Sequence, residues 1–304
     1  MIEYLKKMRL QESITRLGTL KPRCWIRVVD PNEDEINYLV NSFKLDRNEI
    51  LDGLDVNEVP RIDSEEDVNY IFLRLPRYGG EFATDSFLFI LTKNNFITIS
   101  RENLGILDQL SNSQTFLTNH KTRALLQILA HISKSFNFNV NKILKEVKKD
   151  RRNILNLNSK DILDLVKQED IFNDYIFSFS PLIDIYNKLL KSKIIQLEEG
   201  EKEFIEDLVI DLNQTLNSCK SGLKTINNMR DYYSTTLSND RNNTLKILTA
   251  CTVFLTVPTI FSSLYGMNIR LPGQNLSGMF WILIGIIFLI WFLVFQIFKK
   301  LRFL

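Results

Sequence analysis

Residues 247–268 read ILTACTVFLTVPTIFSSLYGMN, and residues 279–298 read MFWILIGIIFLIWFLVFQIF. From the start of the first run to the end of the second, the only charged side chain is Arg270. The second run has about the twenty apolar residues that a bilayer-spanning helix requires. A buried helix in a soluble core is the alternative for the first run, but a second span follows it at once. We therefore expect transmembrane helices at about 245–264 and at 279–298, joined by a loop at 265–278.

The basic residues that flank these spans predict their orientation, because Lys and Arg concentrate on the cytoplasmic side of a membrane. Arg241 and Lys246 flank the first span, and Lys299 and Lys300 begin a basic tail at 299–304. The N-terminus has no apolar core of the kind that a secretory signal needs. The sequence thus predicts an integral protein of the cell (inner or plasma) membrane with both termini in the cytoplasm.

The remaining residues predict an α+β cytosolic domain, a mixed sheet with flanking helices. Within 1–118, the runs CWIRVV, NYIFLRL, FLFILT and NFITIS are rich in apolar and β-branched residues, which is typical of strands. Helical periodicity replaces these signals over 119–195. From 196 to 264 a helix-period apolar face continues with no proline before Pro258. This pattern predicts one stalk helix, roughly 90 to 100 Å long, that runs into the first span.

Polar side chains in and just before the first span recur at alternating spacings of three and four. This heptad period places them along one helix face. Packing of helices against one another is one explanation of such a stripe, because small hydroxyl residues allow close approach. The other is an aqueous path enclosed by several copies of the helix, which requires a homo-oligomer. The stripe consists of Asn242, Leu245, Thr249, Thr252, Thr256, Thr259 and Ser263.

Several function classes find no support in the sequence. The chain has no glycine-rich phosphate loop. Its two histidines, His120 and His131, lie eleven residues apart on one predicted helix and have no nucleophile motif beside them. The chain has 38 basic and 36 acidic residues, and along the soluble region the two kinds are intermixed, which argues against a nucleic acid partner. We therefore do not expect an enzyme.

The motif YGMN at residues 265–268, directly after the first of two C-terminal spans, resembles the pattern of the CorA family of divalent-cation channels. The segment VPTIFSSLYGMN is similar to the end of that family's pore helix, including Pro258 and Thr259. CWIRVVDPNEDEINYLVNSFKL resembles the family's first strand and the helix that follows it. LDGLDVNEVPRID is similar to the next acidic helix end and Arg-Pro segment, although Val59 stands where the family usually has Arg.

This resemblance implies a homopentameric funnel in the lipid bilayer, with Gly266, Met267 and Asn268 as its selectivity filter. Magnesium holds its water tightly, so rings of neutral amide and hydroxyl groups that bind the ion's own waters suit it. The implied function is influx of hydrated Mg²⁺, driven by the membrane potential and closed by cytosolic Mg²⁺. Transport of Co²⁺ or Ni²⁺ as hydrated mimics is also expected. Mg²⁺ is then both the transported ion and a regulatory ligand.

Two further groups of residues are candidates for gating. Leu245 and Leu248, near the inner end of the first span, are candidates for a hydrophobic gate that closes by dewetting. By resemblance, Asp52 and Asp207 of neighbouring subunits bind a regulatory Mg²⁺ that holds the closed state, and Asp231 matches another acidic position of the family's stalk. For each of the three carboxylates, a solvated surface position is the alternative.

One departure from the family and two competing functions stay open at this point. The outer loop lacks the acidic residue that is common in the family and carries Arg270 near Asn268, which lowers cation occupancy at a pore mouth. The first competing function is a zinc or other transition-metal transporter of the same family. The second is a membrane-anchored sensor or scaffold without ion flux.

Overall fold

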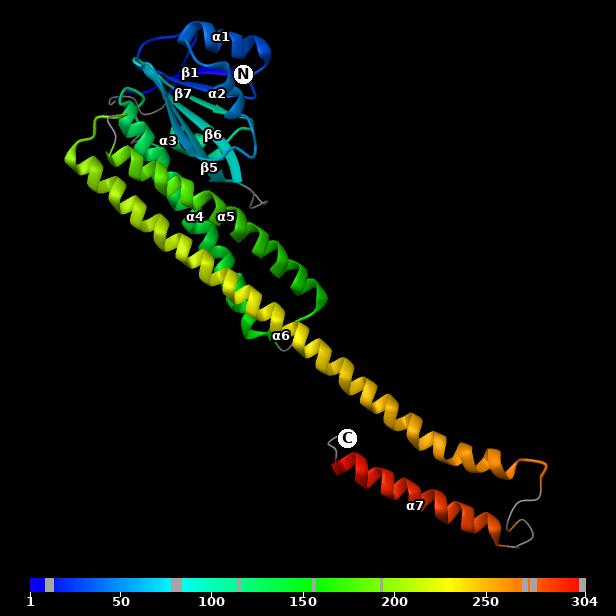
Figure 1. Ribbon diagram of the computed structural model, residues 1–304. Coiled ribbons are helices and arrows are strands. Elements are labelled where there is room, and N and C mark those ends of the chain that lie inside the picture. Colours follow the sequence, from blue (N-terminus) through cyan, green and yellow to red (C-terminus); the bar gives the residue numbers. More distant parts are fainter. Residues whose placement is uncertain are drawn as a thin grey trace. The chain divides into compact units, whose positions relative to one another are not determined.

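The structure is a computed structural model (Figure 1) that describes residues 1–8, 14–77, 84–113, 116–154, 157–191, 194–269, 273 and 278–300. It divides into two compact units, Met1–Met229 and Arg230–Leu304. The first contains the sheet and most of the helices, and the second contains the two apolar helical segments.

The first unit is built on a seven-stranded sheet with the order β2-β1-β3-β7-β6-β5-β4. All neighbouring strands are antiparallel except β3 and β7, which are parallel, so the sheet is mixed. Strand β4 forms one edge of the sheet. The strands are β1 (Ile2–Lys6), β2 (Thr15–Leu17), β3 (Trp25–Val29), β4 (Arg61–Glu65), β5 (Val68–Pro76), β6 (Thr84–Leu91) and β7 (Phe96–Ser100).

Both faces of this sheet are buried, because successive side chains of a strand point to opposite faces. Tyr70 and Phe72 of β5 join a core with α1 (Glu33–Phe43) and α2 (Arg47–Asp52). The alternate residues of β5, among them Ile71, join the larger core formed with the remaining helices. This two-sided burial explains why β5, β6 and β7 are nearly continuous apolar runs.

Contacts at both ends hold helix α2 in position, and they thereby determine the position of its last residue, Asp52. The Asp46 side chain accepts hydrogen bonds from the backbone N–H groups of Asn48 and Glu49, at 2.6 and 3.4 Å, and so caps the first turn. At the other end, a Cβ added to Gly53 would lie 2.7 Å from the side chain of Leu88. Only glycine allows α2 to lie this close to the sheet.

Three long helices form the rest of the first unit (Figure 1). They are α4 (Lys121–Arg152), α5 (Ser159–Lys191) and the N-terminal part of α6 (Glu199–Tyr265), and the short α3 (Gly105–Asn112) precedes them. A Cβ on Gly222 of α6 would lie 2.6 Å from the ring of Phe172, which shows how tightly this part of α6 packs. In the second unit, the C-terminal part of α6 is followed by α7 (Met279–Lys300).

The predicted fold class is confirmed: a mixed sheet with flanking helices, one long helix and two apolar C-terminal helices. The predicted strands correspond to β3, β5, β6 and β7. Strands β1 and β2, which precede the strand expected to be first, were not predicted. β2 has three residues and β1 includes Glu3 and Lys6, so neither shows a clear apolar run.

Candidate functional site

One face of the membrane segment of α6 packs against α7. Ala250 is buried there, and Val253, Phe254, Val257 and Phe261 are partly buried. These positions follow the i, i+3, i+4, i+7 spacing of a single helix face. The Phe254 ring meets two aromatic rings of α7, with centroid distances of 6.0 Å to Trp291 and 6.3 Å to Phe298. Both helices have the length and hydropathy of candidate membrane spans.

A specific hydrogen bond joins the same two helices. Pro258 lies inside α6 and has no N–H, so the carbonyl of Phe254 four residues earlier loses its usual intrahelical partner. The indole Nε1 of Trp291 donates to that carbonyl oxygen at 2.9 Å. In a bilayer no water would replace this donor, so Trp291 satisfies a polar group that is costly to leave alone. The sequence places Pro258 in the first span, but no local pattern identifies Trp291 as the donor.

The predicted stripe lies on a different face of α6. At about 100° per residue, its centre is about 130° around the helix from the centre of the face that packs on α7. All seven stripe residues are exposed in the single chain. The stripe is therefore not used for packing between α6 and α7.

The hydroxyl groups of the stripe threonines all use their hydrogens in the same way. Thr249, Thr252, Thr256 and Thr259 each donate to the carbonyl oxygen four residues earlier, at 2.7 to 2.9 Å. A hydroxyl has one hydrogen to donate and two lone pairs that accept. Since each hydrogen is used by the backbone, these oxygens can only accept hydrogen bonds from other molecules. At these four threonines the stripe thus presents hydrogen-bond acceptors and no hydroxyl donors, whereas the amide of Asn242 offers both.

The two candidate gate leucines are also exposed in the single chain. The exposed fraction is 49% for Leu245 and 63% for Leu248. Leu245 belongs to the stripe, and Leu248 lies beside it on the helix surface. Apolar side chains at this place interrupt an otherwise polar surface near Asn242 and Thr249.

The motif after α6 forms a tight turn. The Gly266 N–H donates to the carbonyl of Ser262 at 2.9 Å, and the Met267 N–H to that of Leu264 at 3.3 Å. A Cβ on Gly266 would lie 3.0 Å from the Ser262 oxygen, which favours glycine. Asn268 is exposed, and its side-chain amide has no hydrogen bond among the described residues. Arg270 lies outside the described residues.

Asp52 lies in a cluster of charged groups around Arg61. The Arg61 guanidinium donates to Asp52 at 2.9 Å, lies within 3.5 Å of Glu49 and contacts the carboxylates of Glu58 and Asp63. It also lies 3.9 Å from the centre of the Phe72 ring. Burial and repulsion from Asp63 raise the pKa of Glu49, although Arg61 opposes this. One cation therefore faces four carboxylates, and the cluster attracts further positive charge.

The three candidate regulatory carboxylates lie on two helices, Asp52 at the end of α2 and the other two on α6. Asp207 and Asp231 are exposed on α6, and Asp231 belongs to the second unit. Among the residues that the structure describes, no group of three or more Asp, Glu, His or Cys side chains is arranged to hold a metal ion. The sequence had not singled out Arg61, which neutralises part of the charge around Asp52.

Comparison with known proteins adds to this geometry. The family model described as CorA-like Mg²⁺ transporter protein matches residues 22–300. The cobalt/magnesium transport protein CorA of Methanocaldococcus jannaschii is 23% identical over 294 residues, which cover 91% of this chain and 90% of that protein.

Two solved structures share the fold. The complete structure of the CorA magnesium transporter from the same archaeon aligns with a TM-score of 0.82 at 19% identity, over 98% of this chain and 97% of that one. The cytoplasmic domain of ZntB from Vibrio parahaemolyticus aligns with a TM-score of 0.64 at 11% identity, over 78% of this chain and 98% of that one.

The hydrogen bond between Trp291 and Phe254 can be tested with a double-mutant cycle. Trp291→Phe keeps an aromatic ring but removes the donor, so we expect it to destabilise the protein by about 1 kcal/mol. Pro258→Ala restores an N–H for the Phe254 carbonyl, so the same tryptophan change should cost less in that background. Thermal unfolding of the full chain in detergent measures both effects.

The matched control is Trp281→Phe, because Trp281 also lies in α7 and is 72% exposed. This change should leave the unfolding temperature nearly unchanged. Strictly additive effects of Trp291→Phe and Pro258→Ala would show that the bond does not stabilise the pair of helices.

Proposed function

The chain belongs to the CorA family of divalent-cation transporters, and from this premise we propose that it is a channel for the influx of hydrated Mg²⁺. The observation that carries the proposal is the acceptor stripe of α6, which is exposed in the single chain and points away from α7. The transported ion is the substrate of this path, and no resident cofactor is needed for conduction.

The stripe supports a homo-oligomer. A polar helix face is costly in lipid, and one helix cannot enclose a path for an ion. Several copies of α6 placed around an axis would turn their stripes toward a common aqueous centre, while α7 of each copy would lie toward the lipid. The resemblance to the family gives the number as five. Both termini would then be cytoplasmic, as the flanking basic residues indicate.

The chemistry of the stripe fits a hydrated cation. Waters bound to Mg²⁺ point their hydrogens outward, so their natural partners are acceptors, and the ion gives up these waters reluctantly. Threonine oxygens whose own hydrogens are bound to the backbone offer such acceptors without competing donors. A neutral acceptor also holds a divalent ion less tightly than a carboxylate, which allows the ion to leave.

Asn268 is the proposed outer filter, together with Gly266 and Met267. Its amide is exposed and unpaired among the described residues, so five copies would place five amide oxygens at the mouth. The membrane potential drives influx, because a doubly charged ion gains about 4.6 kcal/mol per 100 mV. Leu245 and Leu248 form the proposed gate, where an apolar ring excludes water when the helices approach.

Regulation by cytosolic Mg²⁺ is proposed to involve Asp52, Asp207 and Asp231. Asp52 and Asp207 would meet across a subunit boundary, and the excess of carboxylates around Arg61 raises the local concentration of cations. Asp231 is proposed to bind a cation at a second position of the stalk. Occupation of these sites would hold neighbouring subunits together and favour the closed state.

A zinc transporter of the same family is the second candidate. The fold match to the ZntB cytoplasmic domain concerns the fold alone, so it does not decide between the two ions. The hydroxyl and amide oxygens of the stripe and of Asn268 are hard ligands that suit Mg²⁺ better than Zn²⁺. A sensor or scaffold without ion flux is separated from both by the same experiment.

Asn268→Ala is expected to abolish Mg²⁺ uptake, because it removes the amide oxygens that bind the ion's waters at the mouth. Uptake is measured in proteoliposomes under an inside-negative potential. Asn243→Ala is the matched control, since Asn243 is an exposed amide off the stripe, and it should leave uptake unchanged. Zinc flux in place of magnesium flux would favour the second candidate, and no flux of any divalent ion would favour the scaffold.

The stripe can be tested with two adjacent serines. Ser263 lies on the stripe, whereas Ser262 is also exposed but lies about 100° away around the helix. Ser263→Ala should lower the rate of Mg²⁺ uptake several-fold, and Ser262→Ala should not, because only the former removes an acceptor from the path. Equal effects of the two changes in the same liposome assay would contradict a path along this face.

Asp52→Asn and Asp207→Asn are each expected to raise the internal Mg²⁺ concentration that halves uptake. Both remove a charged ligand of the proposed regulatory ion without changing the pore. Glu206→Gln is the control, because Glu206 is exposed beside Asp207 but on another face of α6. Inhibition that is unchanged in both aspartate variants would remove them from the regulatory site while leaving the channel proposal intact.

A further inference from the structure

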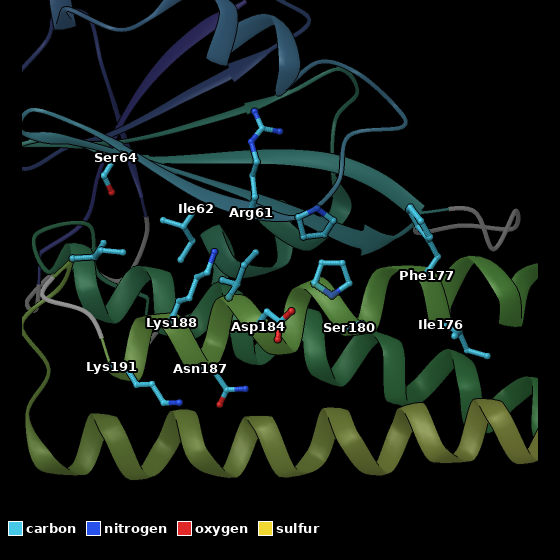
Figure 2. A pocket seen from close by; sticks show the side chains of 14 residues that line it. Arg61, Ile62, Ser64, Ile176, Phe177, Ser180, Asp184, Asn187, Lys188 and Lys191 are labelled. Carbon is cyan, nitrogen blue, oxygen red and sulfur yellow. The ribbon is translucent and has the colours of Figure 1, made fainter.

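A groove of about 800 Å³ lies between the edge strand β4 and helix α5 (Figure 2). Ile62 and Ser64 of β4 point into it from the sheet, and residues of α5 face them. Its wall is largely apolar, with prolines and isoleucines from the two elements and from the residues next to them. The volume is in the range of sites that bind a small molecule or a short peptide. The apolar lining is formed by Pro60, Ile62, Ile176, Pro181, Ile185 and Ile194.

The strand on one side of the groove has an unpaired edge. A two-residue turn, Glu66 and Asp67, joins β4 to β5, and Glu65 is paired with Val68 at the turn. In such a hairpin the closing pair is hydrogen-bonded and the pairs alternate from there. The backbone N–H and C=O groups of Ile62 and Ser64 therefore point away from β5. Over the described ranges, no hydrogen bond from another element reaches these groups.

The helix on the other side also exposes a backbone acceptor. Pro181 lies inside α5, so the carbonyl of Phe177 four residues earlier has no intrahelical donor. Phe177 and Pro181 both line the groove. In the part of the chain that the structure describes, no side chain donates to this carbonyl. This differs from α6, where Trp291 donates to the carbonyl that Pro258 frees.

The charges along the groove are uneven. Lys188 and Lys191 lie toward one end in Figure 2, and the half-exposed ring of Phe177 lies toward the other. Neither lysine forms an ion pair with any described residue, and the one carboxylate of the lining is Asp184. The guanidinium of Arg61 points away from α5 and is occupied by the carboxylates around α2. The groove therefore carries positive charge that no ion pair within the described residues neutralises at the end where Lys188 and Lys191 lie.

We propose that this groove binds an extended peptide segment of a partner protein that carries an acidic side chain next to apolar ones. The peptide backbone pairs with the outward groups of Ile62 and Ser64 and extends the sheet by one strand. One of its N–H groups donates to the Phe177 carbonyl, and its acidic side chain meets Lys188 and Lys191. A small anion would satisfy the lysines only, whereas an extended chain repeats its donors and acceptors with the spacing of the strand edge.

The proposal is independent of ion conduction, and the full chain in lipid nanodiscs can test it directly. A phage-displayed library of random heptapeptides is selected on the nanodiscs, and we expect enriched sequences that alternate apolar and acidic residues. The consensus heptapeptide, labelled with fluorescein, is then titrated with the protein by fluorescence anisotropy. Failure to enrich any sequence above empty nanodiscs would overturn the proposal.

Variants of the protein separate the contributions to binding. Ser64→Pro removes an outward N–H and the side-chain hydrogen bond to Asn69 but keeps the backbone pairing with β5, and edge strands tolerate proline at such positions. We expect it to weaken binding about tenfold or more. Reversal of both groove lysines (Lys188→Glu with Lys191→Glu) should weaken binding by a similar factor, and less so at high salt. The charge-matched control, Lys145→Glu with Lys160→Glu, should bind normally.

A modified peptide tests the strand pairing on the unchanged protein, so the result does not depend on whether the proline variant folds. N-methyl groups can be placed on the odd or on the even residues of the consensus peptide. One of these two peptides loses the N–H groups that face β4 and cannot complete the strand pairing. That peptide should bind the unchanged protein at least about tenfold more weakly. Binding that survives both Ser64→Pro and N-methylation, but not reversal of the lysines, would overturn strand addition in favour of a simple anion site. Mg²⁺ uptake by the same variants in liposomes should match that of the unchanged chain.

Discussion

In the hydrocarbon of a bilayer, a backbone carbonyl without a donor is costly, and the membrane unit is organised around the one that Pro258 frees. Trp291 donates to the Phe254 carbonyl, and this bond fixes which face of α6 lies against α7. The aromatic contacts of Phe254 with Trp291 and Phe298 lie on the same face. Because another face of α6 is occupied, the hydroxyl stripe remains exposed in the single chain.

The threonines of α6 follow from the same requirement. Each hydroxyl gives its hydrogen to a carbonyl of its own helix, as polar groups in apolar surroundings commonly do. Such bonding is usually an argument that a threonine has no further role. On an exposed face the result is different, because the oxygen keeps its lone pairs and loses its only donor. A helix that satisfies itself in this way becomes selective for partners that donate, and the waters around a cation are such partners.

The sequence predicted the features that depend on local pattern and missed those that depend on contacts. The spans follow from the absence of charge, and β5 to β7 follow from burial on both faces. Strands β1 and β2 are short and charged, so only their pairing identifies them. Likewise, nothing local distinguishes Trp291 from the other tryptophans, because its partner lies 37 residues away. Glu58 and Asp63 are near neighbours of Arg61 in the sequence, whereas Glu49 and Asp52 reach it only through the packing of α2 on the sheet.

The two internal prolines show how the surroundings decide what a free carbonyl does. In α6 the carbonyl must find a donor within the protein, so the bond to Trp291 is part of the fold. In α5 the carbonyl that Pro181 frees belongs to Phe177, an exposed residue that lines an open groove, and a carbonyl that water can hydrate costs little. A ligand that brings an N–H to this carbonyl only replaces a water. It gains affinity chiefly if it also covers the apolar wall and pairs with the edge of β4. An extended peptide meets all three conditions at once, whereas a small anion does not.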